Sequence, residues 1–258
     1  MNIIDLNCDI GEDYGAYRLL TEQEERMLMQ HVSSVNIACG FHAGDPKTMR
    51  RTVRLALEHD VAIGAHPGLA DLHGFGRREL QVSAEDVYEL VLYQLGALMA
   101  VAKAEGGIVR HVKPHGALYN MAARNEHLAE AIVKAVYKVD DQLILYGLAD
   151  SQLIRAAKQR GLAYASEVFA DRRYEQDGSL TPRTHHAASI TDVNEATAQV
   201  LQIITTGKVT TRTGQFLPLQ ANTICIHGDN GAAVQFARLL SQQLKEAGWV
   251  IRGKGVRL

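Results

Sequence analysis

The chain has 258 residues, of which 47% are apolar and 22% charged, and its formal net charge is −2. This length suffices for one α/β barrel or for two small domains. The nearly balanced charge predicts neither nucleic acid nor an acidic membrane surface as a partner. We find no apolar run of membrane-spanning length and no secretory leader pattern, and three cysteines cannot form a disulfide framework. We therefore expect a cytoplasmic protein without a membrane span.

Short apolar runs alternate with segments of helical periodicity along the chain. Seven runs predict strands, at residues 3–10, 32–39, 61–66, 108–113, 142–148, 163–169 and 223–227. Apolar residues three and four positions apart predict helices over residues 48–58, 83–105, 125–137, 151–160, 191–205 and 231–247. This alternation is typical of parallel strands joined by right-handed crossovers. An α/β fold follows, and the number of units favours a (β/α) barrel over a doubly wound open sheet.

One part of the chain departs from this alternation. Residues 170–190 are polar, and residues 208–219 are typical of a β-hairpin. We interpret residues 1–258 as a single (β/α) barrel domain, with a polar loop and a hairpin inserted at about residues 170–220.

Ionisable residues follow six of the seven predicted strands. Because ligands bind at the carboxyl ends of parallel strands, these residues are expected to meet at one mouth of the barrel. The candidates are Asp9, His42, His66, Lys113, His115, Glu167, Asp171, Arg172, His227 and Asp229. Taken singly, a histidine at a strand end is more often a structural hydrogen-bonding residue. It is the joint pattern that favours a functional site.

The first predicted strand carries two kinds of side chain in alternation. Asp5, Asn7 and Asp9 occupy every second position, with aliphatic residues and Cys8 between them. Because successive side chains of a strand point to opposite faces, this pattern predicts a polar barrel interior. We expect Asp9 to meet His42, His66 and His227 at the mouth. Asp5 is expected to lie deeper and to have a structural role.

Six segments together resemble a known family. DLNCDIGE (5–12), NIACGFHAGDP (36–46), GAHPG (64–68), VKPHGALYN (112–120), EVFADRRY (167–174) and CIHGDN (225–230) resemble the LamB/YcsF family. The resemblance implies an irregular seven-stranded (β/α) TIM-like barrel, similar to the glycoside hydrolase/deacetylase superfamily. It also implies the activity of a 5-oxoprolinase: hydrolysis of 5-oxo-L-proline (pyroglutamate) to L-glutamate, coupled to hydrolysis of ATP. Two further subunits, B and C, are implied as partners.

Hydrolysis of a lactam with ATP needs a general base, a general acid and positive charge near the phosphoryl group. Asp9 or Glu167 could be the base, and a histidine such as His66 or His115 could be the acid. Asn7, Lys113, Asp171, Arg172 and Asp229 are candidates for binding substrate or phosphate. We expect Mg²⁺ to accompany ATP.

Two aspects of this interpretation stay open. A divalent metal could be held at the mouth by Asp9, His42, His66 and His227. The sequence contains no G-x-x-x-x-G-K-[ST] motif, so an ATP site would be of an unusual kind or would come from a partner subunit. The alternative functions are a metal-dependent deacetylase-like amidohydrolase and a non-catalytic substrate-binding subunit.

Overall fold

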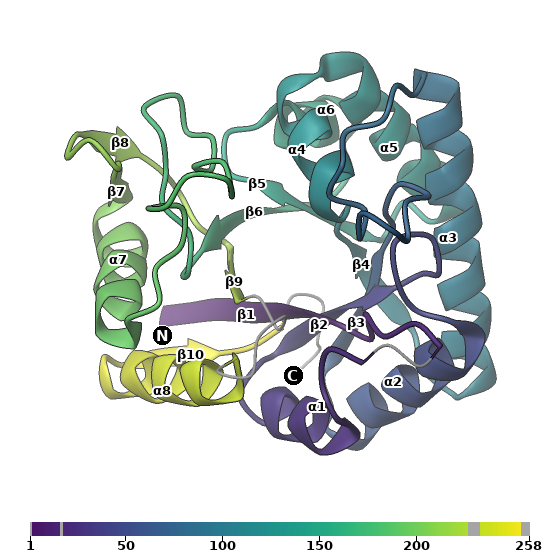
Figure 1. Cartoon of the computed structure of the whole chain (residues 1–258), viewed down its shortest axis with the longest axis horizontal. Coiled ribbons are helices and arrows are strands. Elements are labelled where there is room, and N and C mark those ends of the chain that lie inside the picture. The colour runs from purple at the N-terminus through teal and green to yellow at the C-terminus, as the bar shows by residue number, and fades with distance from the viewer. Residues whose placement is uncertain (1, 16–17, 227–232, 254–258) are drawn as a thin grey trace.

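Seven parallel strands close into a barrel (Figure 1). The computed structural model describes residues 2–15, 18–226 and 233–253. The barrel strands are β1 (Asn2–Ile10), β2 (Ser34–Ala38), β3 (Ala62–His66), β4 (Val109–Val112), β5 (Ile144–Leu148), β6 (Tyr164–Phe169) and β9 (Thr223–Ile226). Strand β9 pairs with both β6 and β1, and this double pairing closes the sheet. The predicted barrel is therefore confirmed, and the open sheet is excluded.

A further strand, β10 (Trp249–Ile251), pairs in parallel with the first residues of β1. Strand β9 pairs with β1 from Asp5 onward. The first residues of β1 therefore pair with β10, and the following residues pair with β9. The sequence did not predict β10, because three residues are too few to show a periodic pattern.

Eight helices surround the strands in the part of the chain that the structure describes (Figure 1). They are α1 (Glu22–Met29), α2 (Pro46–Glu58), α3 (Ala84–Ala104), α4 (Gly116–Arg124), α5 (Glu126–Val139), α6 (Gln152–Arg160), α7 (Val193–Thr206) and α8 (Ala233–Glu246). Helices α1 and α4 were not predicted from the sequence. Helix α1 is rich in charged residues and buries only Glu25, Leu28 and Met29, so its apolar pattern is weak.

Side-chain caps begin six of the helices in the described part of the chain, α1, α2, α3, α5, α6 and α7. Ser83 accepts a hydrogen bond from the backbone N–H of Asp86, whose carboxylate accepts the N–H of Ser83, and this reciprocal pair begins α3. Among the described residues, α3 is the helix whose length and hydropathy would suit a membrane span. It packs along α5 and against β3 and β4, as a core helix of a barrel does.

The chain between β6 and β9 lies where an insertion was predicted. Loop 170–192 and α7 are followed by the antiparallel hairpin of β7 (Lys208–Thr210) and β8 (Phe216–Pro218). The loop folds back on itself through a bridge between Arg172 and Ser189. Its Tyr174 is buried, and the hydroxyl accepts the N–H of Phe169 at 2.8 Å. This bond ties the loop to the end of β6.

Polar and aliphatic side chains of β1 point to opposite faces of the strand, as the alternation predicted. Ile4, Leu6 and Ile10 belong to the apolar core. Asp5 points into the barrel and accepts hydrogen bonds from Ser34, Tyr146 and Thr223. Burial raises the pKa of Asp5, and the hydroxyl donors oppose that rise. The hydroxyls thus satisfy a carboxyl group deep in the interior, which supports the structural role expected of Asp5.

Candidate functional site

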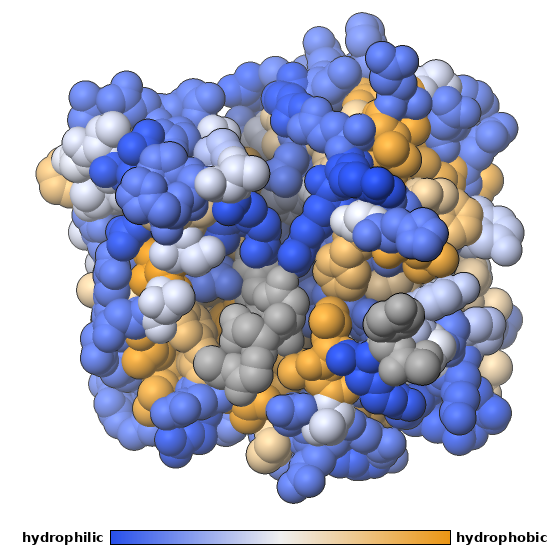
Figure 2. All heavy atoms as spheres, viewed as in Figure 1, coloured by the Kyte–Doolittle hydropathy of each residue, from blue (hydrophilic) through white to orange (hydrophobic). Residues whose placement is uncertain are grey.

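A pocket of about 960 Å³ lies at the carboxyl ends of the barrel strands. Its floor includes Asp9, Glu12, His66, Lys113 and His115, and loop 170–192 contributes to its wall. Figure 2 shows that hydrophilic residues border a hollow over the barrel. The mouth predicted from the strand ends is therefore the place where the ionisable side chains gather.

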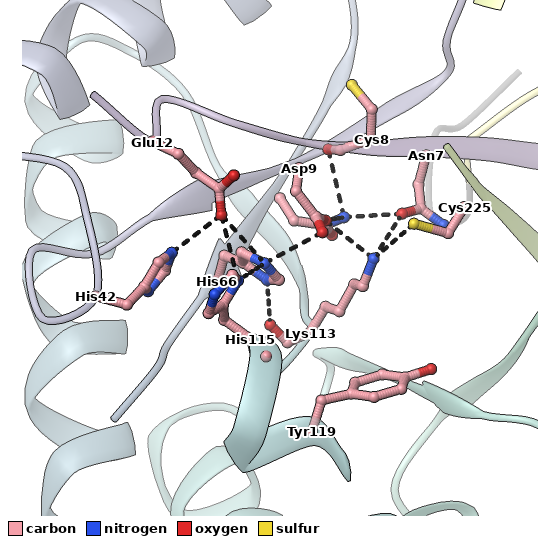
Figure 3. A network of polar contacts seen from close by, with 12 residues as sticks. Asn7, Cys8, Asp9, Glu12, His42, His66, Lys113, His115, Tyr119 and Cys225 are labelled. Carbon is pink, nitrogen blue, oxygen red and sulfur yellow. Dashed lines mark hydrogen bonds and ion pairs between the residues drawn. The ribbon is translucent and has the colours of Figure 1, made fainter. Parts of the chain in front are cut away.

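Lys113, directly after β4, is the centre of one polar cluster on this floor. Its ammonium lies 2.9 Å from Oδ1 of Asp9 and 2.8 Å from Oε1 of Glu167. It also contacts Oδ1 of Asn7 at 3.3 Å and the sulfur of Cys225 at 3.1 Å (Figure 3). Burial by itself would lower the pKa of Lys113, but the facing anionic groups raise it well above its usual value. Lys113 is therefore a buried cation with two carboxylate partners.

Glu167 and Asn7 lie behind this lysine, away from the pocket. Glu167 is fully buried, and its carboxylate accepts hydrogen bonds from Asn7 at 3.0 Å and from the hydroxyl of Tyr119 at 2.6 Å. Asn7 also donates to Thr223 at 2.7 Å. All of these groups are satisfied within the protein, so they fix the position of Lys113. The role of Tyr119 was not predicted, because this residue lies on the unpredicted helix α4.

Asp9 joins the lysine cluster to a group of histidines. Its Oδ1 accepts a hydrogen bond from Asn36 at 2.8 Å as well as from Lys113, and its Oδ2 lies 3.4 Å from Nε2 of His66. Asp9 is 8% exposed and faces the pocket. The predicted meeting of Asp9 with His66 is confirmed. The ring of His42 contacts Glu12, and the predicted meeting of Asp9 with His42 stays a prediction.

Three histidines converge on Glu12 (Figure 3). Oε1 of Glu12 lies 3.1 Å from Nε2 of His42, 3.2 Å from Nδ1 of His115 and 3.9 Å from Nε2 of His66. The four residues offer ligand atoms that all lie within 4.8 Å of one another, so they could hold a metal ion. The metal set predicted from the sequence shares His42 and His66 with this cluster and stays a prediction. Glu12 and His115 belong to the cluster, Asp9 adjoins it, and His227 and Asp229 lie outside the described residues.

The electrostatics of this cluster favour neutral rings and an ionised carboxylate. Burial lowers the pKa of His42 to about 3 and also lowers the pKa of His115. Burial alone would raise the pKa of Glu12, but hydrogen bonds with the His115 and His42 rings lower it below its usual value. An ionised Glu12 carboxylate thus lies beside the rings of His42 and His115.

Two glycines allow the histidine rings to pack together. The rings of His42 and His115 stack with centroids 3.7 Å apart and planes 4° from parallel. A Cβ atom on Gly76, where φ is +61°, would lie 2.6 Å from Cβ of His42 and 2.9 Å from Cδ2 of His115. A Cβ atom on Gly68 would lie 2.6 Å from Nδ1 of His42. Any side chain at these two positions would displace the stacked rings.

The wall of the pocket supplies a second buried cation. Arg172 is 5% exposed and donates through Nη2 to the carbonyl of Thr181 at 2.6 Å, while its Nε is buried without a partner among the described residues. Burial, and then the charge of Arg183, lower the pKa of Arg172 to about 10. The neighbouring Asp171 holds the loop through its backbone carbonyl, which accepts the N–H of Ile190 at 2.8 Å. Arg172 thus keeps hydrogen-bonding capacity next to the pocket.

Comparisons with known proteins agree with this architecture. The LamB/YcsF family model matches residues 4–255. The A subunit of the 5-oxoprolinase from Geobacillus kaustophilus (strain HTA426) is 59% identical over 252 residues, which cover 98% of this chain and 97% of that protein. The crystal structure of a lactam utilization protein from Thermus thermophilus has a TM-score of 0.90 at 44% identity, and the match covers 97% of this chain and 99% of that one.

The barrel is also similar to a structure outside that family. A GH113 β-1,4-mannanase has a TM-score of 0.50 at 12% identity, with 94% of this chain and 99% of that chain covered. Likeness at this identity concerns the fold alone. It agrees with the irregular TIM-like barrel of the glycoside hydrolase and deacetylase type that was predicted.

Proposed function

The chain belongs to the LamB/YcsF family, and we propose that it serves in ATP-dependent hydrolysis of 5-oxo-L-proline to L-glutamate, as one subunit of a larger enzyme. The support is the relative named as the A subunit of a 5-oxoprolinase, which is 59% identical over 98% of this chain. The solved neighbour described as a lactam utilization protein supports the same class of substrate. Subunits B and C would be the partners, and the cytoplasm would be the compartment.

The observation that carries this proposal is the pairing of a carboxylate and an ammonium on the floor of one pocket. Asp9 and Lys113 both line the pocket, with their charged atoms 2.9 Å apart. A lactam is a stable amide, so its hydrolysis needs a base for water and positive charge where negative charge develops. Asp9 can serve as the base, and Lys113 can stabilise the oxygen of the lactam or a phosphoryl group bound to it.

The role of ATP is to activate the lactam oxygen. In the proposed sequence, the γ-phosphoryl group of ATP is transferred to that oxygen and ADP leaves. Water then adds to the activated carbon while Asp9 accepts a proton from it. The C–N bond breaks, the ring nitrogen takes up a proton, and an acyl phosphate remains. A second water hydrolyses this acyl phosphate to glutamate and phosphate, so one ATP and two waters are consumed for each lactam.

The proton for the ring nitrogen is best assigned to Asp9. His66 and His115 were also candidates, but each ring directs one nitrogen to a backbone carbonyl and the other toward Glu12. A ring in this arrangement has no proton to offer to a substrate in the pocket. Asp9 lies between the two clusters and can pass on the proton that it receives from water.

Other residues would position the reacting groups. We assign substrate binding to Arg172, because its unsatisfied Nε and its place on the pocket wall suit the carboxylate of 5-oxoproline. Glu167 and Asn7 would act by holding Lys113 rather than by touching the substrate. Contacts of Asp171 and Asp229 with the substrate stay predictions.

ATP, with Mg²⁺, would bind where the partner subunits B and C cover the mouth. Arg124, Arg155 and Arg183 line the pocket beside Arg172 and provide positive charge for phosphate groups. The volume of about 960 Å³ leaves room for phosphate next to a molecule as small as 5-oxoproline. The missing G-x-x-x-x-G-K-[ST] motif supports a site completed by a partner.

The test is release of glutamate from 5-oxoproline with ATP, measured for this chain alone and for the complex with B and C. We expect glutamate and ADP from the complex in equal amounts, and none when Asp9→Asn replaces the native chain. A wild-type complex that binds ATP but releases no glutamate would overturn the proposal.

A metal-dependent amidohydrolase is the second candidate, because the Glu12 cluster could hold an ion. This alternative predicts that the chain alone deacetylates N-acetylated sugars without ATP. Measuring acetate release from such sugars by the isolated chain separates the two functions.

A further inference from the structure

The Glu12 cluster has a chemistry that the proposed reaction does not use. We propose that Glu12, His42, His66 and His115 bind a divalent transition-metal ion beneath the floor of the pocket. This inference stands on the geometry of the four side chains and does not depend on the identity of the substrate.

The first argument is the position of the protons on two rings. Nδ1 of His66 lies 2.7 Å from the carbonyl oxygen of Lys113, and Nε2 of His115 lies 2.8 Å from that of Phe75. A carbonyl only accepts hydrogen bonds, so each of these nitrogens carries the proton of its ring. The remaining nitrogens, Nε2 of His66 and Nδ1 of His115, therefore present lone pairs. They lie 2.9 Å apart.

Two facing lone pairs at this distance repel each other unless something positive lies between or beside them. The carboxylates beside them, Glu12 at 3.2 Å from Nδ1 of His115 and Asp9 at 3.4 Å from Nε2 of His66, also have only lone pairs to offer. A cation shared by the whole cluster satisfies all of these groups at once.

The second argument is the spacing. Four ligands at about 2.1 Å from a tetrahedral ion lie about 3.4 Å from one another. Four of the six pairs of ligand atoms lie 2.9, 3.1, 3.2 and 3.9 Å apart, which brackets that value, and all of the atoms lie within 4.8 Å of one another. The carbonyl partners of His66 and His115 also match the backbone acceptors that orient histidines around metals.

The donor set indicates which metal fits. Three imidazoles and one carboxylate suit zinc and similar ions such as cobalt or iron, whereas magnesium and calcium prefer oxygen ligands. Glu12, His66 and His115 line the pocket, so the ion would border the space where substrate binds. Bound there, such an ion supplies a Lewis acid at the pocket floor.

The experiment is metal analysis of the full chain, purified without chelator and freed of any affinity tag. We expect about one transition-metal ion per chain for the native protein. Glu12→Gln and His115→Ala should each lower that content at least tenfold, whereas His127→Ala, an exposed histidine on α5, should leave it unchanged. Far-UV circular dichroism confirms that the variants are folded, and Glu12→Gln preserves the side-chain volume if His115→Ala does not fold.

A second measurement uses protein stripped of metal by a chelator. Zinc or cobalt chloride should raise its melting temperature, and magnesium chloride should not. Cobalt should also produce a visible absorption band in the native chain and in His127→Ala, but not in Glu12→Gln. Native protein that lacks metal and shows no shift with zinc or cobalt would overturn the inference. So would equal metal content in the native chain, Glu12→Gln and His127→Ala. Neither readout involves 5-oxoproline, so failure of the proposed reaction leaves this test intact.

Discussion

The ammonium of Lys113 lies 2.9 Å from Oδ1 of Asp9, and both side chains reach the floor of the pocket. Lys113 follows β4, whereas Asp9 belongs to β1, so the pair spans the inside of the barrel. The same ammonium contacts Glu167 at the end of β6. One cation therefore links three strands at the level where the reaction is proposed to occur.

Lys113→Met tests this link. The substitution keeps a long side chain but leaves the buried carboxylates of Asp9 and Glu167 without their cation, which typically costs about 3–5 kcal/mol. Urea unfolding should show this loss in the free energy of unfolding. Lys103→Met, at an exposed position of α3, should change the stability by less than about 0.5 kcal/mol. An unchanged stability in Lys113→Met would contradict the bridging role.

Arg172→Met tests the proposed substrate anchor. Loss of a charge-assisted hydrogen bond worth about 1.5–3 kcal/mol should raise KM for 5-oxoproline about 10-fold to 150-fold in the complete complex. We expect kcat to change much less, since Arg172 is assigned to binding. Arg110→Met, at an exposed position of β4, is the matched control. A fall in kcat with an unchanged KM would assign Arg172 to the reaction instead of the binding step.

Gly76→Ala tests the packing of the histidine rings. Gly76 and Gly161 both have positive φ, +61° and +76°, but only at Gly76 would a Cβ atom meet other atoms within 4 Å. Both alanine variants bear the backbone strain of about 1 kcal/mol. The free energy of unfolding of Gly76→Ala should fall by a further 1–3 kcal/mol, roughly the usual cost of overpacking a core. Chemical denaturation of both variants gives the comparison, and equal losses would show that the rings tolerate the methyl group.

Glu25→Gln tests a buried acid on α1. Burial raises the pKa of Glu25 to about 7 from the usual 4.5, although Arg51 opposes the shift. Between these two values the native state binds more protons than the unfolded state, so native stability falls as pH rises through this window. From pH 4.5 to pH 8, this titration should lower the free energy of unfolding by about 3 kcal/mol. Glutamine has no charge to bury, so the variant should avoid this loss.

Urea unfolding at pH 4.5 and pH 8 checks the effect. The two proteins should have similar stability at the lower pH, and Glu25→Gln should be the more stable at the higher pH. Glu89→Gln, at an exposed position of α3, serves as the control. A stability difference that is the same at both pH values would exclude a titration of Glu25.

The sequence was a good guide to the strands and to the faces of β1. Side chains of a strand alternate with a period of two, so Asp5, Asn7 and Asp9 had to share one face, and the structure places their side chains inside the barrel. The polar residues after the strands could also be predicted to meet, because parallel strands present their carboxyl ends at one edge. Neither inference requires knowledge of long-range packing.

The composition of the histidine cluster could not be predicted in the same way. Glu12 follows Gly11, whose φ of +68° turns the chain after β1, so the alternation no longer indicates where the next side chain points. The available signal was a second carboxylate, Glu12, three residues after Asp9 at the end of the first strand. The partnership of Glu167 with Tyr119 depends on α4, which was not predicted.

Closure of the barrel joins the two ends of the chain. Asp5 pairs in register with Thr223, and Cys8 with Ile226, so β1 acquires its barrel neighbour β9 only from residues made more than 200 positions later. During synthesis, Asp5 on β1 leaves the ribosome long before Thr223 on β9. Its carboxylate therefore lacks the Thr223 hydroxyl as a hydrogen-bond donor until β9 has been made. The unfinished chain thus exposes an open sheet edge with unpaired acids for most of its translation. Such an unpaired edge can template pairing with another chain until β9 has been made.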